Sequence, residues 1–492
     1  MQPLHATTKL RYGRNCDNGL LRKLLCFYKC VMYSNKFEVI ICYLFWIGSV
    51  FYGIYGVYNV KKEFKYIDDI YNDFENGWWD KSSKKDVSDF EWQTMLSIFK
   101  QLYPWLILHM IVSEFIRSTD VRVLPYWHCI IGTAFITNTM GIIGLLLVIA
   151  QPVFFYCISK LNKKYYIWIC NLICLVLILY FKSLCNSKNY YVMKYSEMQH
   201  YIIMLTISWV NLRCLSFSID NLSKTKLLHL LSYCFYLPTL CIGPFIQFQH
   251  LKRSYAAHAI DLPKRTFKLL ISFIRFGFWL LFIEFCLHFV YVSALSYQIQ
   301  LVRNLSSSAL YGYGYCMGQL FHLKYVVFYG LSTSIAKFED VKAPATPKCI
   351  GRIHLYSDMW KHFDAGLYQF LLNYIYFPTV GNFTILRRLF SSMLCFSFVY
   401  IWHGIEYHIL TWAFVNYLGI CVEQMIKSLS TLSFIQCLQE GWKQRLLCAV
   451  YSPLLAISAI SNFYFFAGTD IGNIFVERIF QSKYFPLKRI RD

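Results

Sequence analysis

Charged residues are scarce in this sequence, at 15% of 492 positions, whereas a soluble domain of ordinary composition carries about 25%. Hydrophobic residues make up 57% of the chain and aromatic residues 19%. So much apolar surface needs lipid to cover it, and abundant Phe and Tyr suit the aromatic belts of a membrane protein. The composition therefore argues against a soluble globular protein and predicts a polytopic integral membrane protein.

Acidic residues are the rarer of the two charged classes, with 27 Asp and Glu against 48 Lys and Arg and a net charge of +21. A nucleic-acid-binding domain would gather its basic residues on one face. Here they stand in short clusters between apolar stretches, which is the pattern of cytosolic loops under the positive-inside rule. We therefore expect no nucleic-acid partner.

The sequence also lacks a CxxC…CxxC framework, which makes a zinc ribbon improbable on spacing. Its 19 cysteines are scattered, and many stand inside apolar runs. Buried free thiols that behave as small hydrophobic side chains are the simpler interpretation.

No linker rich in Pro, Gly or Ser divides the chain. Residues 1–36 are basic and polar, and the first long apolar run starts only at Phe37, so a cleaved signal peptide is not predicted. We expect a basic cytosolic segment over 1–36, one membrane domain over 37–480 and a basic tail over 481–492. The positive-inside rule favours the cytosol for that tail.

Twelve apolar runs define the fold class. A membrane helix needs about 20 mostly apolar residues. Several runs are too long or too short for one crossing, so we expect an all-α bundle of about ten transmembrane helices plus re-entrant or interfacial helices. The runs are 37–59, 96–116, 126–157, 165–185, 199–217, 227–248, 267–293, 309–333, 366–380, 389–404, 406–426 and 446–467.

Ionisable residues beside or within apolar segments are candidate functional groups because their burial is costly. The first such segment precedes the apolar residues 365–377. Asp358 and His362 are four positions apart, so they share a helix face. Asp364 opens the apolar stretch, where its carboxylate would be partly desolvated. The alternative for Asp364 is an N-terminal helix residue that complements the helix dipole.

The second segment is Trp402-His403-Gly404, between apolar runs with Arg387 and Arg388 before them and a basic residue after them. Basic ends on both sides predict a hairpin whose turn lies deep or towards the lumen. A neutral His403 there could act as a general base. The alternative is a core histidine satisfied by one hydrogen bond.

At these segments the sequence resembles the membrane-bound O-acyltransferase family. The stretch 359–367 resembles, more narrowly, its Hedgehog acyltransferase branch, the protein-cysteine N-palmitoyltransferases. The resemblance covers most of residues 200–480. Further matches are Arg213-Cys214-Leu215-Ser216-Phe217-Ser218, Tyr236-Leu237-Pro238, Gly243-Pro244, Asn416-Tyr417-Leu418-Gly419 and Asn462 followed by Phe466-Ala467-Gly468. The sequence departs from the branch at Ile405, where the branch has a second glycine.

The resemblance implies that His403 and Asp364 are the catalytic residues. It implies that Cys349 ligates the iron of a haem b, a role open to a thiolate, with an ordinary buried thiol as the alternative. Trp402, Asp358 and His362 are candidate substrate-binding residues. Arg387 and Arg388 could hold CoA phosphates, although positive-inside topology also explains this pair.

The reaction implied is transfer of palmitate from palmitoyl-CoA to the N-terminal cysteine of a secreted signalling protein such as Hedgehog. It would take place in the membrane of the endoplasmic reticulum or Golgi, among membrane lipids. The amine can attack directly, or the cysteine thiol can attack first, followed by an S-to-N shift. An O-acyltransferase acting on a lipid or serine hydroxyl, and an inactive relative that binds clients, are the alternatives.

Overall fold

The computed structural model describes residues 19–66, 73–79, 84–186, 196–222, 224, 226–255, 261–349, 351, 355–382, 384–430 and 439–480. Apart from one two-stranded sheet, the regular structure of these residues is helical, which confirms the predicted all-α class. Residues 1–18 of the predicted basic segment and the predicted tail 481–492 lie outside the described residues.

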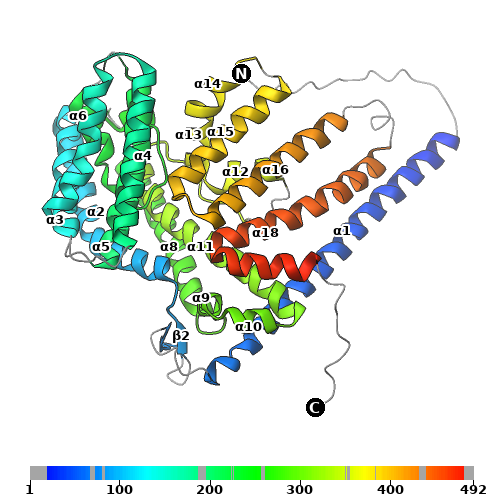
Figure 1. The fold of residues 1–492 in the computed structure, drawn as a ribbon. Coiled ribbons are helices and arrows are strands. Elements are labelled where there is room, and N and C mark those ends of the chain that lie inside the picture. Colours follow the sequence, from blue (N-terminus) through cyan, green and yellow to red (C-terminus); the bar gives the residue numbers. More distant parts are fainter. Residues whose placement is uncertain are drawn as a thin grey trace.

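Ten long helices form the body of the molecule (Figure 1). They are α1 (Gly19–Val60), α2 (Phe90–Thr119), α3 (Leu124–Ser159), α4 (Lys164–Asn186), α5 (Glu197–Asp220), α8 (Leu262–Cys286), α11 (Ser307–Phe338), α15 (Ile385–His403), α16 (Tyr407–Leu429) and α18 (Glu440–Phe480). The shorter helices are α6 (Leu227–Cys234), α7 (Phe248–Lys252), α9 (Val292–Tyr297), α10 (Ile299–Asn304), α12 (Tyr356–Phe363), α13 (Ala365–Leu371) and α14 (Phe377–Val380).

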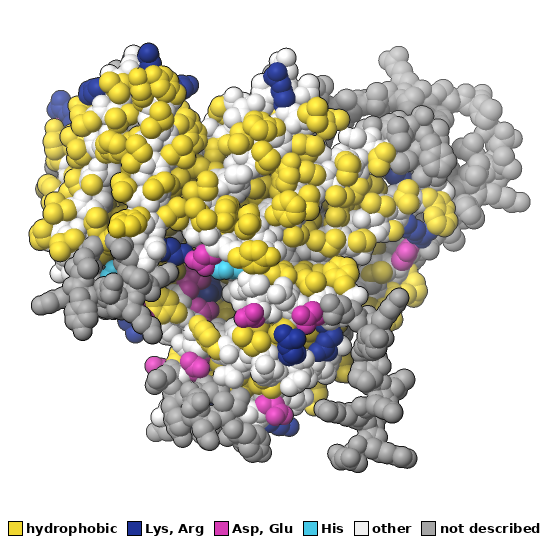
Figure 2. Space-filling view, in the orientation of Figure 1, with side chains coloured by type: hydrophobic (Ala, Val, Ile, Leu, Met, Phe, Trp, Pro, Cys, Tyr) yellow, Lys and Arg dark blue, Asp and Glu magenta, His cyan; other side chains and the backbone are white. Residues whose placement is uncertain are grey.

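Nine helices in the described part of the chain are long and apolar enough to cross a membrane, close to the ten predicted. They are the long helices other than α11. Figure 2 shows one face of the molecule, on which hydrophobic side chains form a broad band with lysine and arginine side chains at its upper end. A band of this kind is what lipid-facing helices present.

The helix α11 is long but largely buried, and it lies at the centre of the bundle against α1 and α8 (Figure 1). Its approach to α1 is very close: a Cβ atom on Gly53 would lie 2.9 Å from Cα of Gly312. Small residues at such a crossing let two membrane helices pack backbone against backbone. This packing places polar side chains of α11 inside the protein rather than in lipid.

Two of the predicted runs do not form single crossings. The run 227–248 forms α6, a 3-10 turn η4 (Leu237–Thr239) and a buried loop, and the run 366–380 forms α13, the π-helical turn η7 (Leu372–Tyr376) and α14. The buried guanidinium of Arg213 on α5 stabilises the first of these segments by donating to the carbonyl oxygen of Cys234 at 3.0 Å and to Oγ1 of Thr239 at 2.9 Å. Both segments fit the expectation of irregular backbone within the membrane domain, which is tolerated where protein surrounds it.

A small layer at the lower end of Figure 1 closes the bundle. It contains α9, α10 and the antiparallel strands β1 (Phe74–Asn76) and β2 (Lys84–Asp86), in which Phe74 pairs with Asp86. The buried Asp86 carboxylate accepts hydrogen bonds from the backbone N–H groups of Ser293 and Ala294, at 3.0 and 3.1 Å, and so fixes the start of α9 against β2.

Candidate active site

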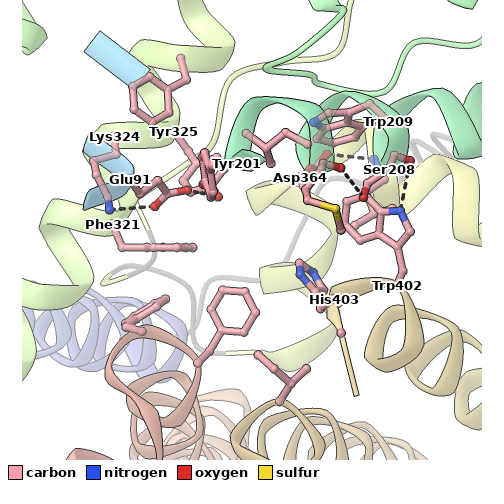
Figure 3. Close-up of a pocket in the computed structure, with 18 of the residues that line it drawn as sticks. Glu91, Tyr201, Ser208, Trp209, Phe321, Lys324, Tyr325, Asp364, Trp402 and His403 are labelled. Atoms are coloured by element: carbon pink, nitrogen blue, oxygen red, sulfur yellow. Dashed lines mark hydrogen bonds and ion pairs between the residues drawn. The ribbon is translucent and has the colours of Figure 1, made fainter. Parts of the chain in front are cut away.

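One cavity of about 980 Å³ lies inside the bundle, and both His403 and Asp364 line it (Figure 3). These two residues are 39 positions apart in the sequence, and the fold brings them to the same space. The cavity wall is built from segments of α2, α4, α5, α11, α12, α13, α15, α16 and α18.

Asp364 stands between α12 and α13, where the chain changes direction. Its Oδ1 accepts a hydrogen bond from the backbone N–H of Leu367 at 2.8 Å, and its Oδ2 accepts one from the hydroxyl of Tyr329 at 2.8 Å. Asp364 is therefore an N-cap of α13, as the alternative interpretation supposed, and it also lines the cavity. Burial raises the pKa of Asp364.

His403 is the last residue of α15 and is partly exposed, to the cavity that it lines. Aromatic rings surround it, with ring centroids at 4.9 Å for Trp402, 5.3 Å for Phe465 and 6.1 Å for Trp412. No described residue forms a hydrogen bond with its imidazole nitrogens. The imidazole therefore differs from a core histidine satisfied by one protein hydrogen bond, and it is free to bind a proton from a bound molecule.

The turn after His403 joins α15 to α16 and confirms the predicted hairpin. Gly404 has φ of +128° and Ile405 has φ of +53°. A β-branched residue at positive φ is a genuine outlier, and this is the position at which the sequence departs from the resembled branch. The turn is held to α4 by an ion pair of 2.6 Å between Nζ of Lys182 and Oε1 of Glu406.

Trp402 contacts α5 through a hydrogen bond and a ring contact. Its Nε1–H donates to the carbonyl oxygen of Ser208 on α5 at 3.3 Å, and its ring packs edge-on against Trp209 with centroids 5.4 Å apart. Trp402 lines the cavity, so the structure brings this predicted substrate-binding residue to the same site as His403 and Asp364.

Across the cavity from these residues lies a charged cluster that the sequence interpretation missed (Figure 3). Nζ of Lys324 on α11 lies 2.8 Å from Oδ2 of Asp89 and 2.8 Å from Oε2 of Glu91, and the hydroxyl of Tyr325 donates to Oε1 of Glu91 at 2.9 Å. Lys324 stands inside the apolar run 309–333, so the rule applied to His403 would have identified it.

Four predicted substrate-binding residues are not among those that line the cavity. On α12, Met359, Trp360 and Phe363 face it, whereas Asp358 and His362 do not. Arg387 and Arg388 are exposed at the start of α15, at the opposite end of that helix from His403. A substrate-binding role for these four residues stays a prediction from the sequence, since none of them lines the cavity of the two predicted catalytic groups.

Cys349 does not line the cavity either. Its Sγ donates to Oε1 of Gln319 at 3.5 Å. Ile350 and residues 352–354, which follow it, lie outside the described part of the chain. Haem ligation by Cys349 stays a prediction from the sequence, and no step of the chemistry below passes through it.

The described part of the chain is therefore a helical bundle of membrane-spanning type in which a histidine and a carboxylate line one cavity. The model of the MBOAT family, the membrane-bound O-acyltransferases, matches residues 154–468. This match covers more than half of the sequence, and the chain belongs to the membrane-bound O-acyltransferase family.

Two relatives are similar over nearly the whole length. The chain is 28% identical over 476 residues to the protein-cysteine N-palmitoyltransferase Rasp of Drosophila melanogaster, covering 91% of each chain. It is 26% identical over 471 residues to the protein-cysteine N-palmitoyltransferase HHAT of Mus musculus, covering 90% of this chain and 93% of the relative. A third, the HHAT-like protein of Mus musculus, is 23% identical over 362 residues, covering 72% of this chain and 71% of the relative.

Proposed function

We propose that this protein is a protein-cysteine N-palmitoyltransferase that forms an amide between palmitate and the N-terminal cysteine of a secreted signalling protein such as Hedgehog. The observation that carries the proposal is the convergence of His403 and Asp364 on one cavity within an acyltransferase-family bundle. The names of the two most similar relatives given above support the choice of acceptor.

His403 is the proposed general base. The nitrogen lone pair of the neutral acceptor amine attacks the carbonyl carbon of palmitoyl-CoA, and the C=O π electrons move to oxygen. His403 takes the proton from the attacking nitrogen. When the tetrahedral intermediate collapses, the C–S bond breaks and the CoA thiolate receives that proton from the imidazolium.

Asp364 is the proposed second catalytic residue. Its carboxylate is held in one orientation by Tyr329 and by the N-terminus of α13. A fixed carboxylate in the cavity can accept a hydrogen bond from the acceptor amine or thiol and orient it for attack, which lowers the entropic part of the barrier. The aromatic and aliphatic wall of the cavity suits a palmitoyl chain, because each buried CH₂ contributes about 0.8 kcal/mol.

The proposed location is the membrane of the endoplasmic reticulum or Golgi. Palmitoyl-CoA is made in the cytosol and the secreted acceptor is exposed in the lumen, so the two substrates have to meet inside the membrane domain. The basic start of α15 then faces the cytosol under the positive-inside rule, and the α15–α16 turn with His403 lies deeper.

A transfer assay with purified full-length protein tests the proposal. Labelled palmitoyl-CoA is incubated with a peptide that begins with cysteine, and the product is treated with hydroxylamine, which cleaves thioesters but leaves amides. We expect hydroxylamine-resistant label on the peptide. Label that appears only in lipid would overturn the proposal in favour of a lipid O-acyltransferase, and no transfer with intact donor binding would favour an inactive client-binding relative.

Two matched peptides sharpen the result. An N-acetylated peptide should yield no amide, because its nitrogen cannot attack. A peptide that begins with serine separates the routes: amide formation at a comparable rate indicates direct attack by the amine, and loss of amide indicates that the thiol attacks first.

A further inference from the structure

Of the two lysines that line the cavity within the described part of the chain, one is saturated with partners and the other is not. An ammonium group has three N–H donors. Nζ of Lys324 has three contacts with oxygen, at 3.1 and 2.8 Å from the two carboxylate oxygens of Asp89 and at 2.8 Å from Glu91. Among the described residues Lys182 has one partner, Glu406 at 2.6 Å, so two of its N–H groups have no described acceptor and can face a bound molecule.

The ammonium of Lys182 lies directly beside the histidine motif. A Cβ atom built on Gly404 would lie only 2.6 Å from Nζ of Lys182, so the ammonium packs directly against the backbone of the turn and would have to move aside for a larger residue at 404. Gly404 also has φ of +128°, a backbone conformation that residues other than glycine rarely adopt. The backbone conformation requires glycine at 404, and the Lys182 ammonium lies against that glycine, next to His403.

Lys182 stands near the end of α4, at the last but one residue of the candidate membrane span Lys164–Ser183. A lysine at a span end can also extend to the interface, so a task for Lys182 is inferred from where its ammonium lies. Its side chain is 34% exposed and lines the same cavity as His403 and Asp364. The attack on a thioester places negative charge on the carbonyl oxygen, and preorganised donors for that oxygen are a large part of acyl-transfer catalysis.

We propose that Lys182, held by Glu406 beside the His403–Gly404 turn, is a further catalytic residue that donates hydrogen bonds to the carbonyl oxygen of the acyl donor as it becomes an oxyanion. This inference rests on the proposed acyl transfer but not on the identity of the acceptor, because every acceptor attacks the same thioester carbon. Lys182 neither gains nor loses a proton in the step.

The competing explanation is mechanical: the Lys182–Glu406 pair could serve only to join α4 to the α15–α16 turn. Three variants separate the two explanations. Lys182→Met removes the cation, Lys182→Arg keeps a cation with N–H donors, and Glu406→Gln keeps the cation but weakens the pair. Lys163→Met, an exposed lysine in the turn before α4, is the matched control.

We expect Lys182→Met to lower kcat by about 10²-fold with little change in KM, the lower end of the range for losing one oxyanion donor. Lys182→Arg should recover much of that loss. Glu406→Gln should stay within about fivefold of the parent protein, because a partly exposed ion pair contributes little free energy. Lys163→Met should be unchanged.

Equal losses in Lys182→Met and Glu406→Gln, or a loss confined to KM, would overturn the inference and support the mechanical role. Thermal unfolding of each variant in detergent identifies any loss that comes from misfolding. If the parent protein acylates a lipid rather than the peptide, the proposed function fails, and the same variants then test Lys182 with that lipid as acceptor.

Discussion

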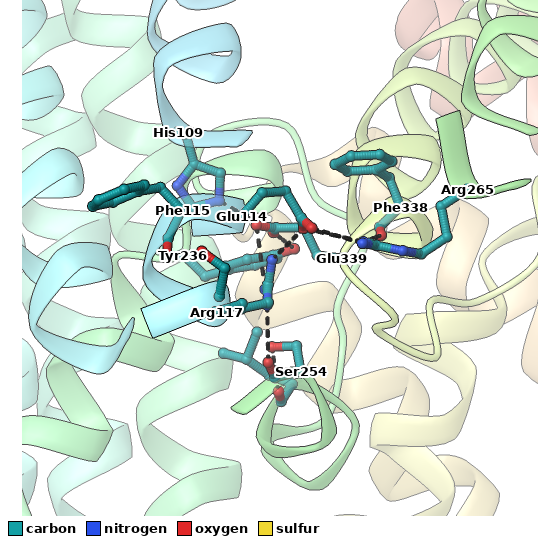
Figure 4. Close-up of polar contacts among 11 residues, drawn as sticks. His109, Glu114, Phe115, Arg117, Tyr236, Ser254, Arg265, Phe338 and Glu339 are labelled. Carbon is teal, nitrogen blue, oxygen red and sulfur yellow. Dashed lines mark hydrogen bonds and ion pairs between the residues drawn. The ribbon is translucent and has the colours of Figure 1, made fainter. Parts of the chain in front are cut away.

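Two polar regions inside this protein differ in how completely their groups are paired. Around Glu339, at the end of α11, the carboxylates and guanidinium groups pair with one another (Figure 4), while Nδ1 of the adjoining His109 has no hydrogen-bond partner among the described residues. Tyr236 donates to Oε2 of Glu339 at 2.6 Å, Arg117 lies 3.5 Å from its Oε1, and Arg265 pairs with Glu114 at 2.6 Å. In the cavity, by contrast, the described residues give the His403 imidazole no hydrogen-bond partner.

The contrast distinguishes polar groups that stabilise the fold from polar groups that are available for chemistry. Buried charges persist when each is compensated by neighbours, and removing one partner is strongly destabilising. A polar group that faces a cavity without a protein partner can bind and transfer protons instead. The variants below break each region in turn, beginning with the largest expected effect.

His403→Ala should abolish nearly all transfer, with a loss of about 10²–10⁴-fold in kcat, because a general base contributes that much. The free energy of unfolding should fall only by what the packing of the ring against its aromatic neighbours contributes, since the imidazole makes no hydrogen bond with a described residue. Transfer to the cysteine peptide and thermal unfolding are measured on the same preparation. A variant that retains the parent rate would remove the assigned base.

Glu339→Gln should show the opposite pattern. The variant removes the charge that faces His109 and Arg117, and Arg117 keeps its ion pair with Glu114 at 2.9 Å. We therefore expect the free energy of unfolding to fall by about 3 kcal/mol, the lower end of the range for a broken buried pair, while the folded fraction keeps its specific activity. Chemical unfolding monitored by tryptophan fluorescence gives the first quantity. A large loss of activity per folded molecule would contradict the separation of the two regions.

The same glutamate predicts a pH dependence. Burial by itself would raise the pKa of Glu339, but His109 and Arg117 outweigh it and hold the pKa well below its usual range. Its ionised form therefore contributes stability above about pH 4.3, the unfolded pKa, and this contribution is lost as the pH falls towards the folded pKa. Below pH 4.3 the parent protein should lose stability more steeply than Glu339→Gln.

Asp364→Asn tests the carboxylate while keeping the cap, because asparagine is also a good N-cap. We expect kcat to fall by about 10-fold or more, within the range of a positioning contribution, and the unfolding midpoint to stay close to that of the parent. Asp364→Ala, which loses the cap as well, should cost a further ~1 kcal/mol of stability. Full activity of Asp364→Asn would show that the cap is its whole role.

Ile405→Gly should have the smallest effect and a stabilising sign. An L-residue in the left-handed region costs about 1–2 kcal/mol, and Ile405 has φ of +53°. Glycine removes this strain but loses backbone entropy on folding, so we expect a net gain of about 0.5–1 kcal/mol. A lower thermal midpoint for Ile405→Gly would show that the isoleucine packs more favourably than its backbone conformation suggests.

The sequence determined the class and much of the outline. Long apolar runs fix membrane helices because no other arrangement satisfies the backbone in lipid, and the basic ends around residues 389–426 fixed the α15–α16 hairpin. His403 stood out for the same reason: an ionisable residue in an apolar run is costly. Lys182 and Lys324 also stand in apolar runs, but the sequence does not predict which residues they contact.

Only the tertiary structure decided which polar groups meet. The packing of α11 inside the bundle brought Tyr329 to Asp364 and Lys324 to Glu91, contacts separated by 35 and 233 positions. The packing of α4 against the α15–α16 turn placed Lys182 beside Gly404, while Cys349, Asp358 and His362 do not line the cavity. Hydropathy and spacing describe neighbours along the chain, whereas a site is made of neighbours in space, which the packing of whole helices selects.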